Sequence, residues 1–127
     1  MDLFKTPGAF SWSELTTTDP AAAAAFYSQL FGWTIKDPDA AMGGYRAVQV
    51  EGQGVAGIMA LPPGAPPMPP HWGCYITVAD ADQTGAQCLS LGGKVLVPPM
   101  DIPGVGRMLV LQDPQGAVIS AIAYKMG

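Results

Sequence analysis

Charged side chains are scarce in this sequence of 127 residues. Lysine, arginine, aspartate and glutamate together make up 13% of it, while 49% of the residues are hydrophobic. Typical soluble domains carry about 25% charged residues, so the share here is about half the usual one. This composition excludes a coiled coil, a long acidic tail and a polybasic segment. A thinly charged domain must hide much of its remaining surface, and we expect a dimer interface or a ligand pocket to hide it.

Positive charge is especially sparse. The sequence has six lysines and arginines, no two of them adjacent, and its net charge is −4. Nucleic-acid binding needs a dense positive patch, so neither DNA nor RNA is an expected partner. The apolar stretches are far shorter than the roughly 18–20 residues of a membrane span, and the first residues lack the pattern of a signal peptide. We therefore expect a cytoplasmic protein that has no membrane partner.

Cysteine and histidine are also rare. The two cysteines, Cys74 and Cys88, do not form a CxxC pair, and His71 is the single histidine. Two buried free thiols are expected in preference to a disulfide or a metal site. One histidine does not support a Ser-His-Asp or Cys-His catalytic set. Glycine and proline are abundant, with 16 and 13 residues, which indicates a folded chain rich in turns rather than a linker, given its hydrophobic content.

The first half of the chain predicts one helix between strands. Residues 9–18 are rich in aromatic and β-branched residues and predict a strand. Asp19 followed by Pro20 is typical of a helix start, and Gly32 of a helix end. Turn residues then separate three short predicted strands, at residues 33–36, 45–50 and 54–61. Residues 62–70 hold six prolines and predict a stiff, extended connector.

The second half repeats this order. We expect a strand at residues 72–78, a helix from Asp80 to Leu91, and strands at 94–97, 107–112 and 117–124, with Pro98-Pro99 as a turn. A shift of 61 positions places Leu15 on Ile76, Asp19 on Asp80 and Gly32 on Gly93. The predicted fold is therefore α+β, with two tandem βαβββ modules forming cupped mixed sheets around a central cavity. We interpret residues 1–127 as one domain, with module one at about 8–61, the connector at 62–70 and module two at about 71–124.

Local motifs agree with a known family. Asp19-Pro20 precedes the segment Phe26-Tyr27-Ser28-Gln29-Leu30-Phe31-Gly32-Trp33, Leu91-Gly92-Gly93-Lys94-Val95 ends the second helix, and Asp113-Pro114-Gln115-Gly116 forms a turn before the last strand. In this order and spacing they resemble the vicinal oxygen chelate superfamily of glyoxalase I, bleomycin-resistance proteins and extradiol dioxygenases. The resemblance covers residues 8–124 and is strongest to small glyoxalase-like proteins. It implies the cupped fold, a cavity and, commonly, a homodimer.

The resemblance also implies four metal ligands, two from each module. The corresponding positions are Trp12, Gly73, Gly57 (or Met59, because the register is open) and Ser120. Indole has no free lone pair, glycine has no side chain, and a neutral serine hydroxyl is a poor ligand. We therefore expect neither a metal site nor a cofactor. His71 lies two residues before the second of these positions; we interpret it as a connector or interface residue, ahead of a proton-transfer role or a metal ligand.

Glu14 is the candidate catalytic residue. If Trp12 points into the cavity, strand alternation places Glu14 and Thr16 on the same face and turns Leu15 toward the helix. A buried carboxylate needs a partner or shifts its pKa. Glu14 is therefore either a general base or ligand anchor, or a structural partner of Arg46 or Arg107, or a rim residue open to water.

The remaining candidates are expected to bind a ligand. Arg107 follows a glycine-rich loop and either contacts an anionic or carbonyl ligand or ends a strand in solvent. Aromatic and sulfur-containing side chains either form a stacking wall for a planar ligand or pack as ordinary core. The full set of candidate ligand-binding residues is Trp12, Tyr45, Met59, Trp72, Tyr75, Arg107, Met108 and Ser120.

Three functions follow from these residues. The first is a metal-free binding module for a small apolar or aromatic molecule. The second is a metal-independent isomerase, lyase or cyclase that uses Glu14 as base, with Arg107 or Tyr45 as partner for a developing oxyanion. The third, which the missing ligands disfavour, is a metal-dependent glyoxalase-type enzyme. The identity of the ligand does not follow from the fold.

Overall fold

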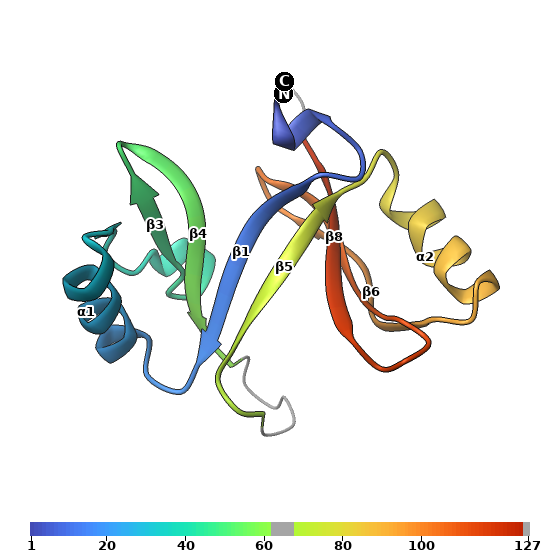
Figure 1. Ribbon diagram of the computed structural model, residues 1–127. Coiled ribbons are helices and arrows are strands. Elements are labelled where there is room, and N and C mark those ends of the chain that lie inside the picture. The colour runs from blue at the N-terminus through green and yellow to red at the C-terminus, as the bar shows by residue number, and fades with distance from the viewer. Residues whose placement is uncertain (62–67, 126–127) are drawn as a thin grey trace. The chain divides into compact units, whose positions relative to one another are not determined.

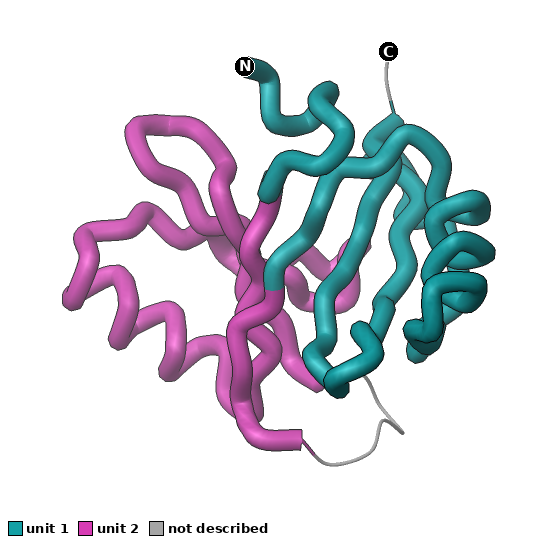
Figure 2. Tube along the Cα trace, turned by 45° about the vertical axis from the view of Figure 1, so that its right-hand side comes forward, with its two compact units in different colours: residues 1–11, 74–127 teal, residues 12–73 magenta. Residues whose placement is uncertain are grey.

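The chain forms two compact units in the computed structural model, which describes residues 1–61 and 68–125 (Figure 2). The first unit along the sequence comprises residues 12–73, which Figure 2 shows in magenta as unit 2. The second comprises residues 1–11 together with 74–127, which Figure 2 shows in teal as unit 1. Each unit holds one α-helix and four β-strands that pair in both parallel and antiparallel directions (Figure 1). This confirms the α+β class and the two βαβββ modules.

The first unit follows the predicted order of elements. Its strands and helices are β1 (Phe10–Thr17), α1 (Pro20–Phe31), β2 (Thr34–Ile35), the 3-10 helix η2 (Ala40–Met42), β3 (Arg46–Val50) and β4 (Gln53–Ala60). The strand order is β2-β3-β4-β1. β1 runs parallel to β4, and the other neighbours are antiparallel. The predicted connector falls largely on residues 62–67, which lie outside the described residues.

The second unit repeats this plan. Its elements are η1 (Leu3–Lys5), β5 (His71–Thr77), α2 (Ala81–Ser90), β6 (Lys94–Ile102), β7 (Gly106–Gln112) and β8 (Val118–Tyr124). The strand order is β5-β8-β7-β6, and β5 runs parallel to β8. The N-terminal segment joins this unit, because the Gly8 N–H donates to the Thr77 carbonyl at 2.8 Å and the Thr77 N–H donates to the Ala9 carbonyl at 2.9 Å.

Both helices begin at the predicted aspartates. Asp19 accepts a hydrogen bond from the Ala22 N–H, and Asp80 accepts one from the Gln83 N–H, each at 3.0 Å. These bonds satisfy N–H groups that the first helical turn leaves without a partner. α1 ends at Gly32, whose φ of 72° is left-handed and suits glycine.

One predicted turn is wrong. Pro98-Pro99 was expected to end a strand, but β6 continues through both prolines to Ile102. β6 is the last strand in its sheet order, and its pairing with β7 shifts register between Val97 and Met100. Proline lacks an N–H donor and is tolerated where a strand lies at an edge or where its ladder is interrupted.

Each helix covers one face of its own sheet. In the first unit, Leu15, Val48, Ala56 and Ile58 pack with Ala24 of α1. In the second, Leu109 and Ala121 pack with Ala81 of α2. The predicted orientation of Leu15 toward the helix is therefore confirmed. Among the described residues, no helix combines the length and apolar character that crossing a bilayer requires.

Candidate functional site

The first unit presents a sheet face that α1 does not cover, which we call the Tyr45 face. Leu15 points toward α1, so the alternation of side chains along β1 turns Trp12, Glu14 and Thr16 to the other side. Glu14 lies beside Gly57 in the parallel register, and Thr16 lies beside Met59. The Tyr45 face therefore carries Trp12, Glu14 and Thr16, which the sequence analysis placed on one face, together with Met59.

Tyr45 links two of these side chains by hydrogen bonds. Its hydroxyl accepts from the indole Nε1 of Trp12 at 2.8 Å and donates to Oε2 of Glu14 at 2.9 Å. The three side chains come from β1 and from the residue that precedes β3. The Tyr45 hydroxyl thus supplies the hydrogen-bond donor that the partly buried carboxylate of Glu14 needs.

The absence of a side chain at Gly57 leaves the space that the Tyr45 ring occupies. A Cβ atom built on Gly57 would overlap the hydroxyl and ring carbons of Tyr45. Glycine inside a strand often marks a close approach by another group, and here that group is the phenol. Gly54, on the same strand, has a looser neighbour, because its Cβ would lie 3.6 Å from the Trp12 ring, an ordinary contact distance.

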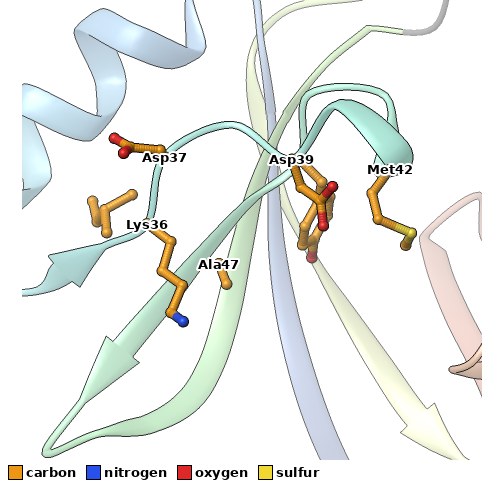
Figure 3. Close-up of a pocket in the computed structure, with 7 residues that line it drawn as sticks. Lys36, Asp37, Asp39, Met42 and Ala47 are labelled. Atoms are coloured by element: carbon orange, nitrogen blue, oxygen red, sulfur yellow. The ribbon is translucent and has the colours of Figure 1, made fainter.

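Beside Tyr45 lies a pocket of about 600 Å³ (Figure 3). Tyr45 and Ala47 belong to its wall, and Ile35, Met42, Lys36, Asp37 and Asp39 complete the lining. Lys36 and Asp37 follow β2 directly, while Met42 ends η2 (Figure 3). The pocket therefore combines an aromatic and aliphatic wall with charged side chains, and its volume is in the range of small-molecule sites.

The residues at the four metal-ligand positions do not fit a metal ion. The Trp12 indole is a donor that is bonded to Tyr45, and Gly57 has no side chain and lies beneath the phenol ring. Gly73 offers no side chain, and Ser120 offers only a neutral hydroxyl. Within the part of the chain that the structure describes, no three His, Cys, Asp or Glu residues group in a way that could hold a metal.

Three predicted ligand-binding residues share one face of the second sheet. Leu109 and Ala121 pack with α2, so Met108 and Ser120, their neighbours in sequence, point away from the helix. Tyr75 pairs with Ser120 in the parallel register and therefore shares its side. Tyr75 and Met108 are buried, and Ser120 is half-buried.

Arg107 lies on the opposite side of β7. Its guanidinium donates twice to Asp82 of α2 and once to Asp101 of β6, each at 3.0 Å. These carboxylates raise the pKa of Arg107, and the hydrogen bond from Arg107 lowers the pKa of the Asp82 carboxyl. Arg107 also lines a second pocket of about 400 Å³ with the loop that precedes it. In the structure this arginine links the sheet to α2 through its ion pair with Asp82.

Trp72 lies in an aromatic cluster on α1 instead of beside Trp12. Its indole Nε1 donates to the Tyr27 hydroxyl at 3.1 Å, and the two rings meet edge to face at 5.4 Å. Tyr27 also stacks on Phe31 and on Trp33. The sequence expectation grouped Trp72 with Trp12 and Tyr45, but its ring contacts lie with the helix.

His71 and the cysteines occupy exposed or half-exposed positions. His71 opens β5, and its Nδ1 donates to the Pro69 carbonyl at 2.9 Å. Both cysteines are free, but Cys74 is exposed and Cys88 is half-buried. The expectation of two buried thiols was therefore wrong, because Cys74 lies on the side of β5 opposite its buried neighbour Tyr75.

Sequence reasoning found Tyr45 but missed the other pocket residues and the role of Gly57. Five of the seven lining residues come from the segment between residues 35 and 42, which the sequence indicates only as a strand end and a turn. A glycine between Ala56 and Ile58 was a usable signal, because an interior strand glycine points to a close neighbour.

Comparison with known proteins agrees with the fold. The family model of the Glyoxalase/Bleomycin resistance protein/Dioxygenase superfamily matches residues 9–120. "Putative glyoxylase CFP32" of Mycobacterium bovis is 43% identical over 115 residues, which cover 88% of this chain and 44% of that protein. "Anthracycline biosynthesis protein DnrV" of Streptomyces peucetius is 37% identical over 129 residues, covering 90% and 46%.

The chain therefore spans less than half the length of these curated relatives. Among solved structures, methylmalonyl-CoA epimerase from Mycobacterium tuberculosis has a TM-score of 0.68 at 15% identity, covering 96% of this chain and 92% of that one. That likeness concerns the fold. The two βαβββ modules, the family model and the two relatives agree, and the chain belongs to the glyoxalase/bleomycin resistance protein/dioxygenase superfamily.

Proposed function

We propose that this protein binds a small, largely apolar or aromatic molecule at the Tyr45 face, without a metal ion. The observation that carries the proposal is the position of Tyr45. Its phenol lies over Gly57, and its hydroxyl accepts a hydrogen bond from the indole of Trp12. Gly57 and Trp12 are two of the positions where the family resemblance implies metal ligands. The same ring lines the pocket of about 600 Å³.

The uncharged part of the pocket wall supports an aromatic ligand, and Lys36, Asp37 and Asp39 are its charged part. Tyr45, Met42, Ile35 and Ala47 supply polarizable and aliphatic surface, which favours stacking and dispersion contacts with a flat ring system. The relative described as an anthracycline biosynthesis protein supports the same class, because an anthracycline contains fused planar rings.

Titration with alizarin, a planar dye, tests this proposal. We expect binding with a dissociation constant on the order of micromolar, measured by calorimetry and by quenching of tryptophan fluorescence. Adamantanol, which is apolar but not planar, should bind more weakly. Native mass spectrometry of the purified protein should also detect a retained small molecule.

Two glycine variants locate the ligand. Gly57→Ala displaces Tyr45, so we expect it to weaken alizarin binding at least about tenfold, which is a loss of roughly 1.4 kcal/mol. Gly54→Ala on the same strand is the matched control, because its Cβ meets Trp12 at an ordinary contact distance. Equal affinity in both variants and the wild type would place the ligand elsewhere.

A second candidate function is a metal-independent isomerase, lyase or cyclase that uses Glu14 as base. It is favoured by the hydrogen bond from the Tyr45 hydroxyl to Glu14, which pairs a carboxylate with a phenol beside the pocket. A carboxylate in reach of an acidic C–H can remove its proton, and a phenol can stabilise a developing oxyanion.

Glu14→Gln separates this enzyme from a binding module. For any ligand found, exchange of an acidic C–H for deuterium is followed by NMR in heavy water. An enzyme should lose exchange in Glu14→Gln while ligand affinity stays within about twofold. A binding module shows no catalysed exchange in the wild type.

A metal-dependent glyoxalase-type activity remains the least supported candidate. Metal analysis of protein purified without chelator tests it, and a stoichiometric divalent metal would overturn the metal-free proposal. We further propose that residues 1–127 act as one domain and that the protein works in the cytoplasm. The second point is supported by two free cysteines, one of them exposed, which suit a reducing compartment.

A further inference from the structure

The N-terminal segment places an aromatic side chain against the second sheet. Phe4 of η1 is half-buried, whereas the other residues of the segment 1–5 are exposed. Figure 1 shows η1 next to the end of β8. The Phe4 ring meets the ring of Tyr124 on β8 edge to face, with ring centres 4.9 Å apart. Phe4 is therefore the side chain of η1 that turns toward the sheet.

Backbone contacts on both sides of Phe4 hold η1 in this position. Thr77 Oγ1 donates to the Leu3 carbonyl at 2.7 Å, and the Asp2 side chain accepts from the Phe4 N–H at 3.1 Å. Gly8, whose φ of 91° is left-handed, turns the chain from η1 toward β1 and pairs with Thr77. None of these hydrogen bonds uses the Phe4 side chain, so the segment can keep its path when the ring is removed.

The side of the sheet that η1 contacts is uncharged and faces away from α2. Ala123 packs with the core under α2, so the alternation of side chains turns Ile122 and Tyr124 to the other side. Thr77 pairs with Ile122 in the parallel register and shares that side. Thr77 and Ile122 are each 3% exposed. Buried, uncharged neighbours beside an aromatic ring favour an uncharged aromatic occupant over a charged one.

The Tyr124 ring is itself fixed in place. Its hydroxyl shares a hydrogen bond of 2.7 Å with the hydroxyl of Ser11, and Ser11 is buried. A ring that is already held by a hydrogen bond loses little conformational freedom when another ring packs on it, which favours binding. Tyr124 thus provides a prepared wall for an aromatic group.

We propose that the second sheet carries a separate site for one uncharged aromatic ring, which Phe4 fills as an internal ligand in this structure. A free ligand with such a ring takes the site when the N-terminal segment withdraws. Phe4 is tethered to the site, so its effective concentration there is on the order of millimolar. The wild type should therefore bind the free ligand at least about tenfold more weakly than a variant that lacks the Phe4 ring. The site lies in the second unit and does not depend on the Tyr45 face.

Toluene binding to Phe4→Ala tests the proposal. Removing the ring leaves an apolar notch that a single free ring can refill, as apolar cavities made by truncation bind benzene. We expect Phe4→Ala to unfold about 4 °C or more below the wild type, and saturating toluene to recover at least about half of that loss. Methylcyclohexane has a similar size but no aromatic ring, so it should recover less.

An NMR titration measures the affinity and locates the ligand. We expect a dissociation constant on the order of millimolar for toluene and Phe4→Ala, and one at least about tenfold higher for the wild type. Nuclear Overhauser contacts should join the toluene protons to the ring protons of Tyr124 in Phe4→Ala.

Two further variants control the experiment. Leu3→Ala lies in the same 3-10 helix, removes a side chain that is 42% exposed, and keeps the carbonyl that Thr77 contacts. Toluene should stabilise it no more than the wild type. Phe4→Leu keeps an apolar side chain without a ring, so it provides the test if the alanine variant does not fold, and it should bind toluene more tightly than the wild type does.

Three results would overturn the proposal. One is an equal toluene affinity in the wild type and in the variants that lack the Phe4 ring, and another is no toluene binding to those variants. The third is equal recovery by methylcyclohexane, which would show an apolar notch without preference for an aromatic ring.

Discussion

Helix α1 has no charged side chain, whereas α2 begins with Asp82 in its first turn and uses it to bind Arg107 of the sheet. The two helices occupy the same place in a repeated order of elements, and both start at a capping aspartate. They differ in what they show to solvent. α1 exposes Phe26 and Phe31, while half of the residues of α2 are polar and its Leu89 is exposed.

The sheet faces differ as well. The Tyr45 face of the first unit carries a bonded set of indole, phenol and carboxylate beside a pocket. The corresponding face of the second unit carries the buried side chains Tyr75 and Met108. The repeated backbone plan therefore sets the helix caps and the strands, while the side chains on the corresponding faces differ between the modules.

The largest expected effect comes from opening either core. Ile58 and Leu109 are both 0% exposed and pack against their own helix. Ile58→Ala and Leu109→Ala should each lower the free energy of unfolding by about 2–5 kcal/mol, through lost burial and a residual cavity. Denaturant unfolding measures this loss. If the chain is one cooperative domain, either variant shifts a single transition, and two separate transitions would contradict that prediction.

The next largest effect on stability is expected from Gly32 and Gly93, which occupy equivalent positions in the two modules after a shift of 61 residues. A Cβ on Gly93 would lie 2.6 Å from Cys88 Sγ and 2.8 Å from the Gln112 carbonyl oxygen, so Gly93→Ala must move backbone. Gly32 has open space, and Gly32→Ala costs only the left-handed backbone strain, about 1–2 kcal/mol. Thermal unfolding should rank Gly93→Ala as the less stable variant. The reverse order would mean that the contact at Gly93 is easily relaxed.

A smaller and equal effect is expected at the two helix caps. Asp19→Ala and Asp80→Ala each remove a hydrogen bond of 3.0 Å to the first turn. Each should lower stability by about 1 kcal/mol. Asp19→Ser and Asp80→Ser, which keep a capping oxygen, should restore most of the loss. A much larger effect at one cap would show that its aspartate has a further role.

The features that could be predicted from the sequence are those that depend on neighbouring residues and recur in both modules. Both caps, Gly32 and the order of strands depend on backbone preferences of neighbouring residues. The turn at Asp113 is another example, because its carboxylate accepts from the N–H groups of Gln115 and Ala117. The turn predicted at the two prolines of β6 was wrong, because a strand tolerates proline when it lies at the edge of its sheet, and the sequence does not show that position.

The site was predictable only in part. Strand alternation placed Trp12 and Glu14 on one face, but their link through Tyr45 depends on the register between β1 and β4 and on the space above Gly57. The sequence left open whether Trp72 belongs to a ligand wall or to ordinary packing, because its position just after the connector does not reveal that its ring packs against Tyr27. The partners of Arg107, likewise, come from α2 and β6, which no local pattern brings together.

The smallest predicted effect concerns the ion pair that only α2 can form. The hydrogen bond from Arg107 lowers the pKa of the Asp82 carboxyl below its ordinary 3.8. A carboxyl whose pKa is lower in the folded state adds stability above its ordinary pKa and loses it as the pH falls through the lowered value. Asp82→Asn should therefore be less stable than the wild type at neutral pH, and only slightly, because both partners of the pair are exposed and solvent screens them. The difference should disappear as the pH falls through the lowered pKa of Asp82. Urea unfolding at a series of pH values measures this difference, and high salt should reduce it. Gln29→Ala on α1 serves as the control, since no charge is removed there and its effect should not change with pH. A difference between Asp82→Asn and the wild type that persists into strong acid would show that Asp82 supports α2 through its shape or its place in the first turn rather than through its charge.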